Sequence, residues 1–394
     1  MNKQFLISLG IFGILVVATL AVIGYGKGYR FGLGDGKIEF NGTGLLVAKS
    51  VPDGAQVLIN DKLKTATNNT ISLAPGDYDV KIIKEGYFTW EKQIKIQAEV
   101  VSKAEALLIP NAPKLESITD IGATDPVIDP NLTKIAFKVA SQSGIRNGIY
   151  VYDMTHTFLT LQSSAIQVVD DNNDIFSQAK LSWSPDGQDL MATTSAQGYP
   201  MTYLLDTDRV NNPPNNVSQT LPSVEANWNS LRKAKAKSIS DSLPVNVRKM
   251  AAANFNVLSY SPDENKILYQ ASRSANLPII IKPRLIGTNS TPEVRNIEQN
   301  SYYVYDVKED RNYKMDSSNF QGAFSWFTDS KHIIFVKNKE VHMAEFDGNN
   351  DTIVYAGPFI PDFIFPWPDA TKIVILTNLG NSQILPNLYT ISLK

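Results

Sequence analysis

The sequence contains no cysteine and only three histidines among its 394 residues. The absence of cysteine excludes disulfide bonds, thiolate nucleophiles and cysteine-ligated metal sites. No charge of one sign dominates, because 37 Lys and Arg stand against 39 Asp and Glu, and nucleic acid is therefore not expected as a partner. Apolar residues make up 43% of the chain, which predicts a folded protein with a sizeable core. At this length we expect several domains or a repeat architecture.

Sequence motifs of common enzymes and metal sites are also missing. The chain has no Gly-x-Ser-x-Gly nucleophile elbow, no His-Glu-x-x-His zinc site and no phosphate-binding loop. Surface or strand-edge roles are expected for the histidines, which are His156, His332 and His342. We therefore predict that the chain is not an enzyme and that it holds no catalytic residue, no cofactor and no metal.

Two acidic segments have the alternating oxygen spacing of a calcium loop. In each segment other residues replace the glycine of such a loop and its closing glutamate, so ordinary turns are expected. The segments are Asp170, Asn172 and Asp174, and Asp347, Asn349 and Asp351.

The chain begins with a long apolar run. Residues 5–23 contain no charged residue, and as a helix they would span about 28 Å, close to the ~30 Å hydrocarbon core of a bilayer. The run predicts a transmembrane signal-anchor over residues 1–23 that contacts the membrane through residues 5–23. A cleavable signal peptide is the alternative, because Thr19, Leu20 and Ala21 offer a small-residue cleavage site.

Glycine recurs at nearly every second position just after this run, from Gly24 to Gly36. This composition predicts a flexible linker over residues 24–42. Positive charges lie on both sides of the run, with Lys3 before it and Lys27 and Arg30 after it. Charge alone therefore does not settle the orientation of the chain in a membrane.

Residues 43–110 alternate between apolar and polar side chains in short runs, as in Tyr78, Val80 and Ile82. Glycine and proline turns separate the runs, which predicts a meander of short strands forming a small β-sandwich. The turn Pro52-Asp53-Gly54-Ala55 and the later pair Gly86-Tyr87 resemble the PEGA domain, whose Pro-Glu-Gly-Ala motif has Asp in place of Glu here. The resemblance implies a surface β-sandwich of bacterial or archaeal envelope proteins, with no known active site.

Residues 111–394 contain a repeat. Each copy has an Asp or Asn turn followed by an apolar strand and then by a second alternating strand, which predicts a β-propeller of about five blades. A sixth, degenerate blade is the alternative. The five copies are Asn131 to Phe137, Asp186 to Ala192, Asp263 to Tyr269, Asp329 to Phe335 and Asp369 to Ile375.

The second copy begins with Trp183-Ser184-Pro185-Asp186-Gly187, which resembles the repeats of TolB-like and WD40-like (PD40-type) propellers. The other copies depart from the glycine of this motif. Those propellers mostly bind other proteins, and some relatives carry a fused hydrolase domain. The combination with the PEGA-like segment implies a single-pass protein of the cell membrane whose C-terminal domains lie outside the cytoplasm.

The last copy ends without residues for the outer strand that a four-stranded blade requires. Its final strand is expected over residues 388–392, and an uncovered edge there would favour aggregation. Residues 114–119 lie just before the first copy and are not otherwise assigned. We predict that they pair with the final strand and close the ring.

The segment 208–254 interrupts the repeat, and residues 225–240 within it predict a helix. Arg232, Lys233, Lys235 and Lys237 are candidate contacts for an anionic partner such as a lipid headgroup or a wall polymer, or they form an ordinary solvated face. Helical spacing predicts that three apolar residues, Trp228, Leu231 and Ile239, dock the helix on the propeller. A second insertion, 279–297, is expected to be an extended hairpin or loop.

The expected function is binding or scaffolding in the cell envelope, with a protein or a cell-wall polymer as the partner. One alternative is an envelope hydrolase that acts on wall polysaccharide or peptide through two carboxylates in the propeller channel. Another is a stalk-like component of a surface layer.

Overall fold

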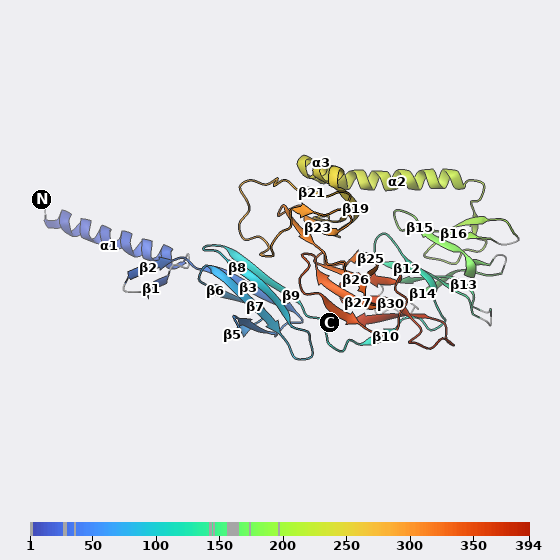
Figure 1. Cartoon of the computed structure of the whole chain (residues 1–394), viewed down its shortest axis with the longest axis horizontal. Coiled ribbons are helices and arrows are strands. Elements are labelled where there is room, and N and C mark those ends of the chain that lie inside the picture. Colours follow the sequence, from blue (N-terminus) through green and yellow to red (C-terminus); the bar gives the residue numbers. More distant parts are fainter. Residues whose placement is uncertain are drawn as a thin grey trace. The chain divides into compact units, whose positions relative to one another are not determined.

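The computed structural model describes residues 3–26, 30–34, 37–141, 144, 146–155, 165–172, 175–195 and 198–394. The chain divides into two compact units. Unit 1 comprises Met1–Leu108 and Ile281–Pro292, and unit 2 comprises Ile109–Ile280 and Glu293–Lys394. Short strands make up most of both units, as predicted for an all-β protein (Figure 1).

The chain begins with helix α1, Lys3–Gly26. In the part of the chain that the structure describes, no helix combines the length and the apolar character needed to cross a membrane. The transmembrane segment predicted for residues 5–23 is therefore not supported.

The segment predicted as a flexible linker, residues 24–42, contains a hairpin. Strands β1 (Arg30–Gly34) and β2 (Lys37–Asn41) pair antiparallel in it. Apolar residues alternate in the sequence of both strands, at Phe31 and Leu33 and at Ile38 and Phe40. This period of two favours a strand despite the glycine content.

Residues 43–110 form the predicted β-sandwich. Its three-stranded sheet has the order β6-β3-β9, and its four-stranded sheet has the order β5-β4-β7-β8. The topology is not the simple meander that we predicted, because β3 pairs parallel with β9, the last strand. The strands are β3 (Gly44–Val51), β4 (Gln56–Ile59), β5 (Lys62–Ala66), β6 (Asn69–Leu73), β7 (Gly76–Ile83), β8 (Trp90–Ile96) and β9 (Val101–Leu107).

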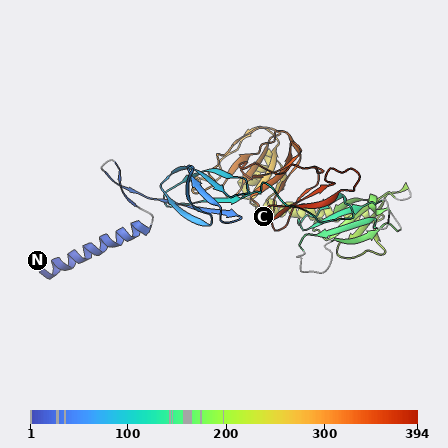
Figure 2. The ribbon, with the colours of Figure 1, turned by 90° about the horizontal axis from the view of Figure 1, so that it is seen from below.

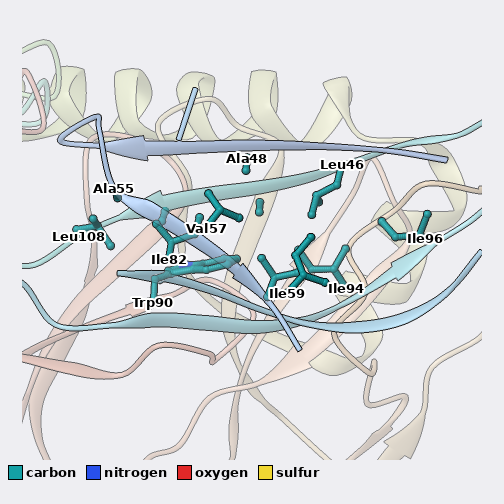
Figure 3. Packing of buried hydrophobic residues seen from close by; sticks show 13 residues of the cluster. Leu46, Ala48, Ala55, Val57, Ile59, Ile82, Trp90, Ile94, Ile96 and Leu108 are labelled. Atoms are coloured by element: carbon teal, nitrogen blue, oxygen red, sulfur yellow. The ribbon is translucent and has the colours of Figure 1, made fainter. Parts of the chain in front are cut away.

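The core of the sandwich lies between its two sheets (Figure 3). Leu46 from one sheet and Val57, Ile82 and Trp90 from the other are almost completely buried. Each of these large apolar side chains contributes roughly 1.5–3 kcal/mol to folding. Exposed residues alternate with buried ones along β8, which is the pattern of a sheet with one wet face.

Unit 2 contains five four-stranded antiparallel sheets in the described residues, which we call blades 1 to 5 in chain order. The count confirms the predicted five repeats. Blade 1 has β11 (Thr124–Ile128), β12 (Lys134–Val139), β13 (Gly148–Asp153) and β14 (Ala165–Asp170); blade 2 has β15 (Lys180–Trp183), β16 (Asp189–Thr194), β17 (Met201–Asp206) and β18 (Asn215–Asn216); blade 3 has β19 (Phe255–Tyr260), β20 (Lys266–Ala271), β23 (Tyr302–Asp306) and β24 (Arg311–Lys314); blade 4 has β25 (Phe320–Trp326), β26 (His332–Lys337), β27 (Glu340–Glu345) and β28 (Thr352–Tyr355); blade 5 has β29 (Ile364–Pro366), β30 (Lys372–Thr377), β31 (Asn387–Ser392) and β10 (Leu115–Ser117).

Neighbouring blades share apolar cores. Blades 1 and 2 pack through one buried cluster, and their strands lie together in Figure 2, coloured teal to green. A second cluster joins blades 3 and 4, and a third joins blade 5 to blade 1. Blades 4 and 5 also meet where the Thr328 hydroxyl donates to the Trp367 carbonyl, at 2.7 Å. Apolar cores shared between adjacent sheets are expected in a propeller.

The fifth blade is completed by the segment that precedes the first blade. Strand β10 pairs antiparallel with β31, with Leu115 opposite Ile391 and Ser117 opposite Tyr389. Beyond the strand, the amide of Ile118 donates to the Leu388 carbonyl at 2.9 Å. The predicted pairing of residues 114–119 with the final strand is therefore confirmed.

The repeated turns share one backbone geometry although their sequences differ. In all five copies, the residue after the repeat Asp or Asn has a φ between +56° and +75°. Only one of these residues is glycine, the residue type that adopts this left-handed conformation without strain. The five residues are Leu132, Gly187, Glu264, Ser330 and Ala370.

The insertion 208–254 forms two helices, α2 (Leu221–Ser242) and α3 (Val245–Asn254), which extend the single helix predicted over residues 225–240. Residues of α3 pack on the core of blade 3. Figure 1 shows both helices along one side of the strands of unit 2.

The second insertion leaves unit 2 through a two-residue ladder, β21 (Ala275–Asn276) with β22 (Asn296–Ile297). Between these strands the segment Ile281–Pro292 belongs to unit 1. There the Ser290 hydroxyl accepts from the Lys95 amide at 2.9 Å, and the Gln97 side chain accepts from the Gly287 amide at 3.1 Å. The predicted loop is thus an additional piece of unit 1.

Candidate functional site

A cavity of about 480 Å³ lies in unit 2, between helix α2 and three blades. Such a volume falls in the range of pockets that hold small organic ligands. Its lining combines apolar, hydroxyl and charged side chains: Pro130, Asn131, Leu132, Lys235, Ile239, Ser259, Tyr260, Ser261, Pro262, Glu264, Phe324, Ser325 and Trp326.

The repeat explains why distant residues meet at this cavity. The first strand of each blade is followed by the repeat turn, so the carboxyl ends of these equivalent strands gather on one face of a propeller. Strand β19 ends at Tyr260, β25 ends at Trp326, and the turn after β11 supplies Pro130. Helix α2 adds Lys235 and Ile239, which lie one turn apart on the same helix face.

Two buried polar atoms of the lining have no hydrogen-bond partner in the part of the chain that the structure describes. They are the Ser259 hydroxyl and the Trp326 indole nitrogen. The Trp326 side chain is only 4% exposed. Leaving such a group unsatisfied typically costs about 1–3 kcal/mol, and unpaired buried groups in native proteins call for a physical reason.

The equivalent tryptophan of blade 2 is satisfied. Trp183 and Trp326 both lie three residues before the repeat Asp. The indole nitrogen of Trp183 donates to the Val127 carbonyl at 3.0 Å. The free indole N–H of Trp326 is therefore not a general property of this repeat position.

The charges of the cavity are one lysine and one carboxylate. Lys235 has no ion-pair partner among the described residues. Glu264 lies on the exposed repeat turn of blade 3. Burial raises the pKa of the Tyr260 phenol, so this hydroxyl stays protonated at neutral pH and can donate a hydrogen bond.

The four basic residues predicted as partner contacts lie in different surroundings. Only Lys235 reaches the cavity. The Arg232 guanidinium lies over the Trp228 ring of its own helix, 5.8 Å from the centroid. Lys233 and Lys237 are exposed and do not line the cavity.

The three apolar residues predicted to dock this helix also lie in different surroundings. Trp228 is buried and Ile239 lines the cavity, whereas Leu231 is 41% exposed. The helix is therefore held by one face that also carries Lys235, seven residues after Trp228.

The histidines lie away from this cavity. His332 pairs with Asp329 at 2.5 Å, and His342 pairs with Asp351 at 2.6 Å. His156 lies outside the described residues. Over the described ranges, no group of three or more His, Asp or Glu side chains is placed to hold a metal ion.

The structure describes the second of the two calcium-like segments completely and the first only in part. Asp174 lies outside the described residues, so the first segment is described only in part. In the second segment the Asp347 carboxylate accepts from the Asn349 amide, at 3.2 Å, and Asp351 pairs with His342 and Lys337. These contacts are those of an ordinary turn.

Apart from Lys235, the residues that line this cavity were not predicted as a site. Tyr260 and Trp326 were part of the repeat pattern, and Ser259 carried no signal at all. The available signal was positional, because equivalent strand ends of a ring converge on one face. The approach of α2 to that face could not be read from the repeat, since the insertion follows no repeat spacing.

Comparison with known proteins agrees with the sandwich. Residues 43–110 match the model of the PEGA domain family, so the chain carries a PEGA domain there. No curated protein matches the sequence.

Several solved propellers are similar to the chain. The β-propeller domain of the Trilobed protease from Pyrococcus furiosus, described as having an open velcro topology, is 14% identical, and the match covers 90% of this chain and 98% of that one with a TM-score of 0.24. A putative TolB from Agrobacterium tumefaciens is 12% identical over 74% of this chain and 75% of that one, with a TM-score of 0.22. TolB from Acinetobacter baumannii is 14% identical over 80% of this chain, with the same TM-score, and the match spans 59% of that protein. The assignment of a propeller rests on the five sheets described above and not on these scores.

Proposed function

We propose that the chain is an envelope-associated binding protein and that the cavity beneath α2 is its binding site. The observation that carries this proposal is one cavity of about 480 Å³ that Lys235 of α2 lines together with aromatic residues of two blades, Tyr260 and Trp326. Apolar walls with a few polar groups are the usual lining of a ligand-binding site. The PEGA domain supports the placement in the envelope.

Binding is favoured over hydrolysis by the composition of the lining. Hydrolysis of a glycosidic bond by the usual route requires two carboxyl groups about 5 to 9.5 Å apart. Among the described residues, Glu264 is the one carboxylate in the lining. A metal-independent hydrolase with a carboxylate pair is therefore not supported at this cavity.

The location outside the cytoplasm is part of the same proposal. Protease added to intact cells should remove unit 2, and fractionation should recover the chain with the envelope. Digestion only after lysis would overturn the location and leave the binding site untouched.

The binding site can be tested by site-specific photocrosslinking in intact cells. A crosslinking residue in place of Lys235, at the lining, should give one discrete adduct. The matched control is the same residue in place of Lys233, which is exposed two positions away on the same helix. Equal adducts at both positions would show ordinary surface collisions and would overturn the assignment of the cavity.

A further inference from the structure

We propose that strand β19 of blade 3 is a docking surface for an extended apolar segment of a partner polypeptide. The segment would lie along β19, cover Val257 and Leu258, and reach the cavity at Tyr260. This inference rests on the proposed function, because Tyr260 belongs to the lining of that cavity and the segment is the class of partner that the cavity would bind.

The first observation is the exposure of apolar side chains on β19. Val257 is 40% exposed and Leu258 is 49% exposed, although both lie within the strand. We call these two residues the exposed pair. The ladder with β20 shifts register between Val257 and Ser259 and leaves Leu258 opposite no residue, and such a bulge re-aims side chains. In the described residues of the other first strands, β11, β15, β25 and β29, no large apolar side chain is exposed to this degree.

The equivalent position of blade 2 is covered by a neighbouring blade. Val257 lies opposite Tyr269 in its ladder. Leu181 lies opposite Ala192, the residue that corresponds to Tyr269 in the repeat. Leu181 is only 9% exposed, because it belongs to the apolar cluster that blades 1 and 2 share. Phe324, in the first strand of blade 4, is likewise buried in the cluster shared with blade 3. The preceding blade thus supplies the apolar cover in both cases.

Blade 2 does not supply this cover for blade 3. Leu268 packs in the cluster shared with blade 4, and its neighbour Tyr269 points to the opposite face of the sheet. That opposite face is covered by Met250 of α3 and by Leu277 of the second insertion. In the described part of the chain, no residue of blade 2 belongs to this cluster. Helix α3 and the insertion therefore take the place of blade 2, and they leave the exposed pair uncovered.

The backbone of β19 favours an extended polypeptide as the missing cover. Strand β19 is the end strand of its sheet, and among the described strands it pairs only with β20. An extended peptide can add a strand to such an edge, where backbone hydrogen bonds supply affinity and alternate side chains supply specificity. Apolar side chains of the peptide would cover the exposed pair, because burial of both surfaces is favourable. Tyr260, the last residue of β19, leads directly into the cavity.

The main test selects binders for the full chain from a displayed library of random dodecapeptides. We expect enriched peptides to have apolar residues at every second position, the pattern of an added strand. Leu258→Ser should weaken their binding about tenfold, because it removes an apolar side chain from the contact. The matched control is Ile353→Ser, which changes a 39% exposed residue on a strand of blade 4 and should leave the affinities unchanged. Val257→Thr replaces Leu258→Ser if thermal melts show that the latter does not fold.

Labelling of a single thiol tests whether the surface is free in the chain alone. The sequence contains no cysteine, so Leu258→Cys and Ile353→Cys each carry the sole thiol of the protein. Both variants should react with N-ethylmaleimide at similar rates, and an enriched peptide should protect only Leu258→Cys. A slow reaction of Leu258→Cys at every protein concentration would show that blade 2 covers β19 in solution. Slowing with rising concentration would show a second copy there, and either result would overturn the proposal.

The outcomes separate this inference from the proposed function. Absence of enriched peptides with the alternating pattern, or equal binding of them by the wild type and Leu258→Ser, would overturn the docking surface. A discrete adduct at Lys235 in intact cells would still support the cavity as a binding site in that case. Peptides that bind through β19 without a specific adduct at Lys235 would instead overturn the cavity and leave β19 as the binding surface.

Discussion

The Arg295 guanidinium lies 3.0 Å from the Asp310 carboxylate, and the side chain of Asp310 is only 1% exposed. The Tyr305 hydroxyl donates to the same carboxylate at 2.6 Å, and the Ile280 amide donates to it at 2.7 Å. Ile280 is the residue after which the chain leaves unit 2, and it returns at Glu293, which also pairs with Arg295. This buried network therefore ties together both ends of the segment that belongs to unit 1.

Removal of one charge from this network should destabilise unit 2 strongly. Asp310→Asn removes the more deeply buried of the two counter-charges of Arg295 and leaves Glu293 as the other, and breaking a buried pair costs about 3–5 kcal/mol. Denaturant unfolding followed by tryptophan fluorescence measures the change. Glu298→Gln, which breaks the exposed pair with Lys314, is the control and should leave the unfolding free energy almost unchanged. Similar effects of the two substitutions would show that the buried network is not structurally important.

Ring closure predicts a sharp dependence on where a truncated propeller begins. A chain that starts at Asn111 keeps β10, whereas one that starts at Gly122 loses it and exposes the edge of β31. We expect the shorter chain to be less stable by about 2–4 kcal/mol, at about 1 kcal/mol for each lost hydrogen bond, and to aggregate. Thermal melts and light scattering of the two chains check this. Equal stability would contradict the closing role of β10.

The left-handed turns predict which glycine substitutions stabilise the fold. Ala370 has a φ of 56°, where a side chain costs roughly 1 kcal/mol. Ala370→Gly should therefore raise the unfolding free energy by about 0.5–1 kcal/mol. At the equivalent position of blade 2, Gly187→Ala should lower it, because a Cβ there would lie 2.7 Å from the Asn131 side-chain nitrogen. Opposite signs in chemical denaturation are the expected result, and equal signs would contradict it.

The buried His332 and Asp329 pair should make stability depend on pH. Burial alone would lower the His332 pKa. Asp329 raises it, Glu345 adds a smaller increase and Lys331 opposes both, and the net effect is a raised pKa. Burial likewise opposes ionisation of Asp329, yet His332 leaves the Asp329 pKa lowered. The charged pair therefore stabilises the fold most fully between about pH 4 and pH 6.5, the ordinary values of the two groups. Its contribution is lost as pH rises through the raised pKa of His332.

The loss in unfolding free energy caused by His332→Gln should thus be larger at pH 5.5 than at pH 9. Denaturant unfolding of both proteins at the two values measures it. The exposed Lys233→Gln serves as the control and should show no such difference. A loss that is equal at both values, or larger at pH 9, would contradict the assignment of a charged pair.

The parts of the fold that follow a local period could be predicted. Five copies of one turn and strand pattern predicted five blades, because each copy repeats the same pattern of polar turn and apolar strand residues at the same spacing. The closing strand could also be predicted. A blade with three strands leaves an uncovered edge, and residues 114–119 were a nearby segment without another assignment. The parallel pairing of β3 with β9 could not be predicted. Alternation shows that a residue belongs to a strand but not which strand lies beside it.

The cavity required information that the sequence does not carry locally. Lys235, Ser259 and Trp326 are spread over more than ninety residues and belong to a helix and two blades. Each of the four basic residues of α2 was an equal candidate, and only the rotation of the helix about its axis distinguishes Lys235. That rotation is set by the burial of Trp228, a tertiary contact.

The pairing of β10 with β31 also bears on how the protein is made. Thr390 and Glu116, which are bonded in this ladder, are separated by 274 residues. A ribosome adds residues at about 5–20 per second. Strand β10 therefore waits roughly 14 to 55 seconds before its partner strand β31 has been made. During that interval β10 has no strand to pair with, and blade 5 cannot form. The native topology thus delays the completion of blade 5 until the last strand has been made.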